Sequence, residues 1–286
     1  MSQPAAQVAG RPAIETVLHY LVDTGEAPVF KQSDGGTDTV FTVGQREGRR
    51  VTVHNGRLHK GTLSLDVEGF VLAKQPVAID FFDDEQVRKI YTPDVERLVC
   101  RYTGASRAIA YDYTRRSNVP ETKAKYRTRE PVPAPHSDYT DISAAQRLRD
   151  VVGDEADALM KKRFAIVNVW RSIAGTIEEW PLAVCDARSI DDKLMHTFVR
   201  ETTHTNEPSF EYSRMSQTRH SSFDPNHRWY YFPRMTRDEA LLFKNYDTAT
   251  DGRARYCLHS AIEDPDGPAN PAPRESMESR VFAFFD

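Results

Sequence analysis

Cysteine is scarce in this 286-residue chain, with three residues at Cys100, Cys185 and Cys257. An odd number of widely spaced thiols does not make a disulfide framework and is typical of a reducing compartment. The chain also lacks any apolar run near the roughly 18 residues of a membrane-spanning helix. Its N-terminus has no apolar stretch behind a basic start, so we expect no secretory signal. These absences predict a cytoplasmic protein that does not bind a membrane.

An excess of charge of one sign is missing as well. The 38 Lys and Arg residues are balanced by 42 Asp and Glu residues, which gives a net charge of −4 at pH 7. Such a balance offers no electrostatic footprint for nucleic acid or an anionic membrane. The expected partner is a small-molecule substrate. The sequence does not decide the oligomeric state, and a homodimer stays open.

Length and composition favour one domain over residues 1–286, because 39% of the residues are hydrophobic and supply a sizeable core. Residues 1–11 are small, polar and unpatterned, which predicts a flexible tail. Residues 12–24 place apolar side chains at helical spacing, so we expect an amphipathic helix there. Residues 190–225 are polar and irregular, and their length is typical of a lid or substrate loop.

The most informative stretch is the proline-rich approach from Pro131 to His136-Ser137-Asp138. In extended backbone, residues i and i+2 point to the same side, so His136 and Asp138 can converge on one metal ion. They would supply two ligands of a 2-His-1-carboxylate facial triad, which leaves open positions on iron(II). The triad needs a second imidazole from far along the chain. A His-x-Asp pair alone is a weak motif.

His259 is our candidate for that second imidazole. It stands 259 − 138 = 121 residues after Asp138, inside a run with period-two alternation typical of a strand. Arg274 follows 274 − 259 = 15 residues later, at the start of a closing strand. His227 is the alternative third ligand, 227 − 138 = 89 residues after Asp138. We prefer His259 because nothing comparable follows His227.

These residues resemble the iron(II)/2-oxoglutarate-dependent oxygenases. The likeness is greatest to the branch of bacterial and fungal secondary metabolism that includes a cephalosporin C-7 hydroxylase component and fungal hydroxylase/desaturase and endoperoxide-forming enzymes. The superfamily pattern is His-x-Asp, a long gap, a distal His and then an Arg that often reads Arg-x-Ser, here Arg274-Glu275-Ser276. The branch resemblance extends from about Val51 onward and includes the segments 102–106, 167–171, 180–189 and 227–235.

The resemblance implies an α+β, mainly β fold with a double-stranded β-helix core, also called a jelly roll or cupin-like barrel, and flanking helices. It also implies an Fe(2+) ion held by His136, Asp138 and His259. 2-Oxoglutarate, as co-substrate, would chelate this ion, and O2 would take the last open position. The protein would then supply positioning and exclusion of water, because the difficult chemistry belongs to the metal and oxygen.

The co-substrate also needs a cation for its distal carboxylate, and arginine can clamp a carboxylate with a bidentate fork. Arg274 with Ser276 is the first candidate, and Arg280 and Arg171 are the alternatives. Asn168 lies among apolar residues of the clearest predicted strand, so it needs a polar partner. That partner is either the co-substrate or a neighbouring backbone group.

The implied reaction oxidises a C–H bond of a small secondary-metabolism substrate by hydroxylation, desaturation, ring closure or peroxide formation, among which the sequence does not choose. Two other hypotheses remain open. A cupin-like metal-dependent dioxygenase or isomerase would work without 2-oxoglutarate, and a structural salt bridge of Arg274 with Glu278 or with another acid would favour it. A non-catalytic jelly-roll binding module would make the His-x-Asp pair incidental.

Overall fold

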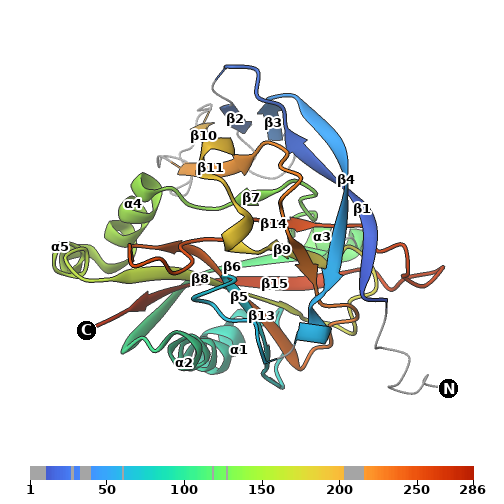
Figure 1. The fold of residues 1–286 in the computed structure, drawn as a ribbon. Helices are drawn as coiled ribbons and strands as arrows, with labels where there is room; N and C mark the ends of the chain where they lie inside the picture. Colours follow the sequence, from blue (N-terminus) through green and yellow to red (C-terminus); the bar gives the residue numbers. More distant parts are fainter. Residues whose placement is uncertain are drawn as a thin grey trace.

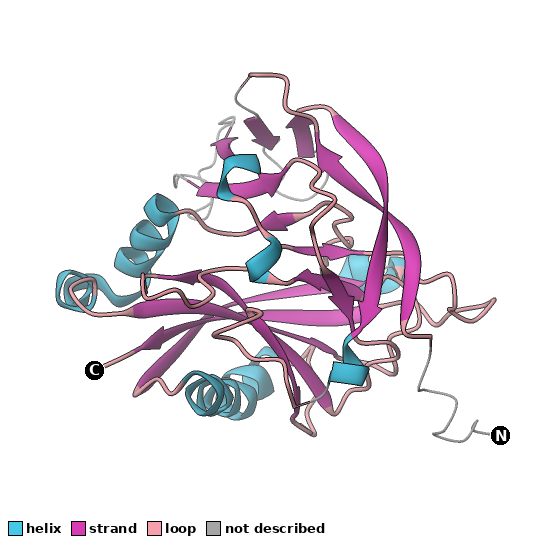
Figure 2. Ribbon diagram, viewed as in Figure 1, coloured by secondary structure: helices cyan, strands magenta, loops and turns pink. Residues whose placement is uncertain are grey.

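The computed structural model describes residues 11–26, 29–32, 40–59, 61–117, 119–126, 128–202 and 216–286. These residues form two curled sheets that face each other, with helices at one end and below the second sheet (Figures 1 and 2). The first sheet has, in spatial order, β1 (Ala13–Leu21), β4 (Arg46–Asn55), β12 (Trp229–Tyr231), β9 (Leu182–Cys185), β14 (His259–Ala261), β7 (His136–Ser137), β11 (Ser216–Ser221), β10 (Met195–Thr202), β2 (Val29–Gln32) and β3 (Val40–Val43).

The second sheet has the spatial order β5 (Phe70–Lys74), β13 (Glu239–Asp247), β8 (Phe164–Ser172), β15 (Glu275–Phe284) and β6 (Arg107–Ser117), and all its pairs are antiparallel. Its central strand β8 is buried at every position, because both faces are covered. Val167 and Val169 pack with Val95 and Leu98 of the helix α2 (Thr92–Thr103), which lies below the sheet in Figure 1. Trp170 lies on the opposite face, which is directed toward the first sheet and forms the interior of the barrel.

Helices begin and end where the sequence supplies caps. The segment α1 (Asp84–Gln86), a π-helical turn (Val87–Tyr91) and α2 (Thr92–Thr103) run on from Asp83, whose carboxylate accepts from two backbone N–H groups, and they end at Gly104 with φ 73°. The remaining helices are α3 (Pro120–Tyr126), α4 (Asp141–Val152) and α5 (Ala156–Leu159), with 3-10 turns at Gly56–His59, Gly153–Glu155, Ala187–Ser189 and Asp192–Leu194.

The helix predicted for residues 12–24 is wrong: Ala13–Leu21 is the strand β1. Its burial alternates, with Ile14 and Leu18 buried and Val17 47% exposed. Ile14 and Leu18 are four residues apart, a spacing that places two side chains on one face of a strand as well as of a helix. Pairing with β4 along the whole of β1 then decided the outcome in favour of the strand.

The expected lid at 190–225 is partly ordered as strands, since β10 and β11 pair with each other inside the first sheet. Residues 203–215 lie outside the described residues, and so does the predicted tail apart from Arg11. The lid, the tail and the single domain therefore stay predictions. The mainly β fold with flanking helices is confirmed. Across the described ranges, no helix combines the length and the apolar character needed to cross a membrane.

Candidate metal centre

His136, Asp138 and His259 converge at the middle of the first sheet. β7 and β14 are neighbours, and His136 lies directly opposite His259 in their antiparallel register. The Oδ1 atom of Asp138 is 3.5 Å from Nε2 of His136 and 3.7 Å from Nε2 of His259. Metal bonds of about 2.1 Å at right angles would place such atoms about 3 Å apart. The three side chains thus need only a small inward movement to bind one ion.

Both imidazoles are prepared as neutral ligands. Nδ1 of His136 donates to the carbonyl oxygen of Ala134 at 2.7 Å, which leaves the lone pair on Nε2 for the metal. Burial lowers the pKa of His136, an effect that the nearby carboxylate of Asp138 partly opposes. Burial also holds the pKa of His259 well below its ordinary value, and its ring packs against Phe243 with centroids 4.8 Å apart.

The two oxygens of Asp138 have different surroundings. Oδ2 accepts from Asn168 and Asn245 at 3.2 Å each, and from Nε and Nη2 of Arg280 at 2.9 and 2.8 Å. Oδ1 faces the two histidines. Burial alone would raise the pKa of this carboxyl, but Arg280 and then the two imidazoles hold it well below its usual range. Asp138 is therefore ionised, with one oxygen fixed and the other free to bind a metal.

The donor set fits iron(II). Two imidazoles and one carboxylate on one side of an ion form a facial triad and leave three further positions for other ligands. A structural zinc site would instead be closed by four protein ligands. Among the residues that the structure describes, His136, Asp138 and His259 form the cluster suited to a metal ion. A double-stranded β-helix with this triad defines a non-haem iron oxygenase.

Arg274 is a buried cation near the indole of Trp170. It is 2% exposed, donates through Nε to Ser276 Oγ at 2.9 Å and through Nη1 to the carbonyl of Trp180 at 2.5 Å, and lies 5.1 Å from the centroid of the Trp170 ring. Burial, reinforced by nearby Arg116 and opposed by the carboxylates of Glu278 and Glu179, lowers the pKa of Arg274 to about 9. These hydrogen bonds of the guanidinium go to neutral oxygens, and the carboxylate of Glu179 accepts from the backbone N–H of Arg274 at 2.9 Å. The guanidinium can therefore still bind a carboxylate.

Arg280 has the opposite character, because carboxylates already surround it. Besides Asp138 it pairs with Glu278 at 2.7 Å and, at closer range, with Asp112. Burial alone would lower its pKa, but these carboxylates, Asp138 first, raise it well above the ordinary value. Glu278 thus pairs with Arg280 and forms no ion pair with Arg274. The position of Arg280 suits it to hold Asp138 in place.

Arg171 and His227 lie away from the triad. Arg171 lies three residues after Asn168 on β8, so its side chain is on the opposite face of the sheet. There it donates to the carbonyls of Gln75 and Arg237 at 2.6 and 2.7 Å, below the second sheet. Nδ1 of His227 is 3.0 Å from the hydroxyl of Tyr20. The structure therefore brings His259, rather than His227, to His136 and Asp138.

Two residues near the triad were missed in the sequence. Asn245 lies among the apolar residues of β13, and the same argument that singled out Asn168, a polar residue among apolar ones, applies to it. His220 pairs with His136 in register, and their rings stack with centroids 5.5 Å apart. Nothing in the sequence distinguishes His220 from other histidines of the polar segment, because cross-strand register brings it to the site.

Comparison with known proteins agrees with this class. A family model described as an oxidoreductase/YMDC permease-like domain matches residues 18–284. The hydroxylase/desaturase efuI of Hormonema carpetanum is 30% identical over 96% of each chain. The Fe(II)/2-oxoglutarate-dependent dioxygenase nvfI of Aspergillus novofumigatus is 28% identical over 90% of this chain and 95% of its own. The solved structure of the iron and α-ketoglutarate-dependent endoperoxidase NvfI has a TM-score of 0.83 at 24% identity, over 96% of this chain and 99% of that chain.

The match to the solved structure establishes the fold, and the sequence matches establish the family. The chain belongs to the iron(II)/2-oxoglutarate-dependent oxygenases of the hydroxylase/desaturase branch, and the predicted resemblance is confirmed.

Proposed function

We propose that this protein uses iron(II), 2-oxoglutarate and O2 to oxidise a C–H bond of a small secondary-metabolism substrate, by hydroxylation, desaturation, or oxidative ring or peroxide formation. The observation that carries the proposal is the cluster of His136, Asp138 and His259, in which Asp138 keeps one oxygen free. When bound, iron and 2-oxoglutarate supply the activation of O2, and 2-oxoglutarate is converted to succinate and CO2.

The protein's own part is to bind and orient. His136, Asp138 and His259 would hold the ion on one side and leave the other side to the co-substrate and O2. Arg274 and Ser276 would bind the distal carboxylate of 2-oxoglutarate, because the buried guanidinium of Arg274 is oriented by the neutral oxygens of Ser276 and Trp180 and can still bind an anion. A bidentate contact with a buried guanidinium is both strong and directional. Arg280 would act on Asp138 rather than on the co-substrate.

The interior also offers polar atoms for ligands that the protein itself does not satisfy. Asn168 Oδ1 and Trp170 Nε1 are buried without a hydrogen-bond partner among the described residues, and both belong to the barrel side of β8. Buried polar groups are rarely left unpaired in a functional state. We assign them to the co-substrate, to the substrate or to ordered water.

Three free thiols support a cytoplasmic location, and a homodimer remains part of the proposal.

The alternative of a cupin-like metal-dependent dioxygenase or isomerase without 2-oxoglutarate would be favoured by a salt bridge of Arg274 with Glu278 or with another acid. Glu278 and Glu179 both act electrostatically on Arg274, but Glu278 forms its ion pair with Arg280, at 2.7 Å. The pairing of Glu278 with Arg280 supports the 2-oxoglutarate enzyme. The alternative of a non-catalytic binding module has no specific support from the site, because it gives no reason for a metal-ready triad.

The test is an anaerobic titration of the metal-free protein, first with iron(II) and then with 2-oxoglutarate. We expect a weak visible charge-transfer band of the keto-acid chelate, and its loss in His136→Ala. Iron binding without the band would favour the cupin-like enzyme. If no metal binds, the binding module becomes the better explanation. Circular dichroism of His136→Ala, which should match the unsubstituted protein, controls for folding.

A further inference from the structure

The strand β13 carries a β-bulge beside the metal centre. Along β8, the neighbours Val167 and Ile166 pair with Lys244 and Tyr246, so Asn245 has no partner and is the inserted residue. A bulge adds one residue to a strand, and it redirects a side chain that regular pairing would place elsewhere. Asn245 is completely buried. Its position follows from the bulge rather than from strand alternation.

Asn245 contacts the segment that carries two of the metal ligands at several points. Its Nδ2 donates to Oδ2 of Asp138 at 3.2 Å, and its Oδ1 accepts from the backbone N–H of Asp138 at 3.1 Å. The hydroxyl of Ser137 donates to Oδ1 and to the backbone carbonyl of Asn245, both at 3.2 Å. Asn245 thus fixes both the backbone and the carboxylate of Asp138, whereas Asn168 holds the carboxylate by one contact.

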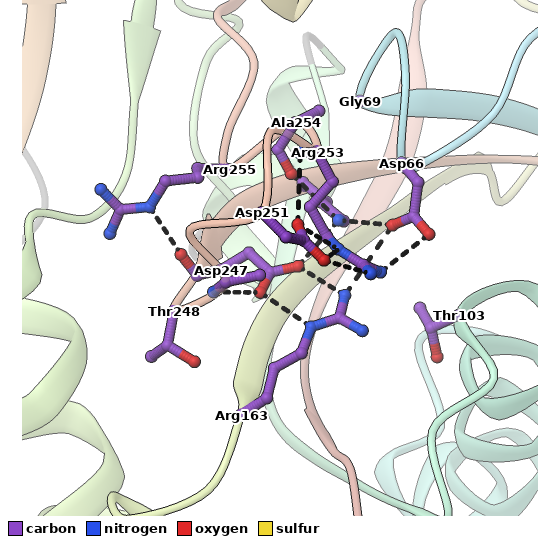
Figure 3. A network of polar contacts seen from close by, with 12 residues as sticks. Asp66, Gly69, Thr103, Arg163, Asp247, Thr248, Asp251, Arg253, Ala254 and Arg255 are labelled. Atoms are coloured by element: carbon purple, nitrogen blue, oxygen red, sulfur yellow. Dashed lines mark hydrogen bonds and ion pairs between the residues drawn. The ribbon is translucent and has the colours of Figure 1, made fainter.

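The bulge itself lies between two buried charges of opposite sign. Lys244, 1% exposed, donates to Asp247 at 2.7 Å, to Asp66 at 2.8 Å and to the carbonyl of Ala254 at 3.0 Å. The completely buried Asp247 also accepts from Arg163 at 2.7 and 3.1 Å. Figure 3 shows Asp66, Arg163 and Asp247 within this network. The Lys244–Asp247 pair spans Asn245 and Tyr246, so it fixes both ends of the bulge.

We propose that Asn245 is a positioning residue for the metal ligand Asp138, and that the Lys244–Asp247 ion pair keeps Asn245 in place. This inference rests on the proposed function, because it assumes that Asp138 binds the metal. In this proposal the bulge places Asn245 where its side chain orients the ligand Asp138. Residues that orient a metal ligand typically change metal affinity by 10- to 100-fold when they are replaced.

The first experiment compares Asn245→Ala, Asn245→Asp and the matched control Asn168→Ala. Co(II) replaces iron(II) as an air-stable probe, and both the dissociation constant and the visible ligand-field spectrum are measured. We expect Asn245→Ala to bind Co(II) about 10- to 100-fold more weakly, with an altered spectrum, and Asn168→Ala to lose less. Asn245→Asp keeps an acceptor for the Asp138 N–H but replaces the donor to Oδ2 with a carboxylate that repels Asp138, so it should also bind Co(II) more weakly than the unsubstituted protein and with an altered spectrum.

The second experiment tests the ion pair with a double-mutant cycle. Lys244→Met with Asp247→Asn removes both buried charges, and we expect Co(II) affinity to fall several-fold. In the Asn245→Ala background the same pair of changes should have no further effect, because the pair would act through Asn245. Equal losses in both backgrounds would show that the pair does not act through Asn245, and would overturn that part of the proposal.

The outcomes separate this inference from the proposed function. If the unsubstituted protein shows no metal binding and no charge-transfer band with iron(II) and 2-oxoglutarate, the proposed function fails. If it shows both, and Asn245→Ala retains the full Co(II) affinity and an unchanged spectrum, the positioning role is refuted. Thermal unfolding of each metal-free variant identifies those that fail to fold. Asn245→Asp, nearly isosteric with Asn, then provides the deciding measurement.

Discussion

Replacing Arg274 with Met should selectively weaken the binding of 2-oxoglutarate. Arg274 is almost fully buried and its guanidinium is held by the neutral oxygens of Ser276 and Trp180, so the distal carboxylate of the co-substrate would be a strong partner for it. Removing one partner of a buried, hydrogen-bonded charge pair costs roughly 2–5 kcal/mol. That corresponds to a dissociation constant raised about 30- to 5,000-fold. Ser276→Ala removes only an orienting contact and should cost roughly tenfold or less.

The assay is the anaerobic charge-transfer titration with 2-oxoglutarate at saturating iron(II). Arg171→Met is the matched control, because Arg171 is also a completely buried arginine but lies below the second sheet. We expect this control to unfold at lower temperature while keeping its affinity for 2-oxoglutarate. An unchanged dissociation constant in Arg274→Met would refute our assignment. A large increase in Arg280→Lys, with Arg274→Met unaffected, would transfer the role to Arg280.

Three further outcomes are expected. His259→Ala should lose iron(II) binding as measured by metal analysis, whereas His227→Ala should keep it, and the reverse order would reassign the third ligand. Burial, partly opposed by Asp224, lowers the pKa of His227 from 6.5 to about 4. The unfolded chain then binds a proton that the native state does not, so the free energy of unfolding should fall by about 3 kcal/mol from pH 6.5 to 4 on this account. His227→Gln should make that decline shallower in urea unfolding, and an unchanged slope would contradict the argument. Phe243→Ala, which removes the ring against His259, should cost about 3–5 kcal/mol of stability in the same assay.

The triad could be predicted because the spacing of two residues in the sequence identifies two of its members, and the order along the chain identifies the third. His136 and Asp138 are two residues apart, and two residues is the period of extended backbone. His259 and Arg274 then follow in the order that the superfamily pattern requires. The distinct roles of the two arginines could not be predicted this way. Whether Arg274 or Arg280 already has anionic partners depends on the neighbouring strands, which sequence spacing does not reveal.

The same limit explains the residues that were missed. Asn245 reaches Asp138 through a bulge, and His220 reaches His136 through the register between β7 and β11. Both are properties of strand pairing, and no local pattern encodes them. The predicted helix at residues 12–24 shows the converse problem. Ile14 and Leu18 fit either period, so only the partner strand β4 could decide between helix and strand.

The neighbours β14 and β7 share a single residue pair, between His259 and His136. In the described part of the first sheet, this pair joins the half that contains β1, β4, β12 and β9 to the half that contains β11, β10, β2 and β3. A metal ion bound by both histidines would therefore link the two halves of the sheet where they share the fewest residue pairs. Metal binding should then stabilise the pairing of β7 with β14, so amide hydrogen exchange in these two strands should slow when the metal binds.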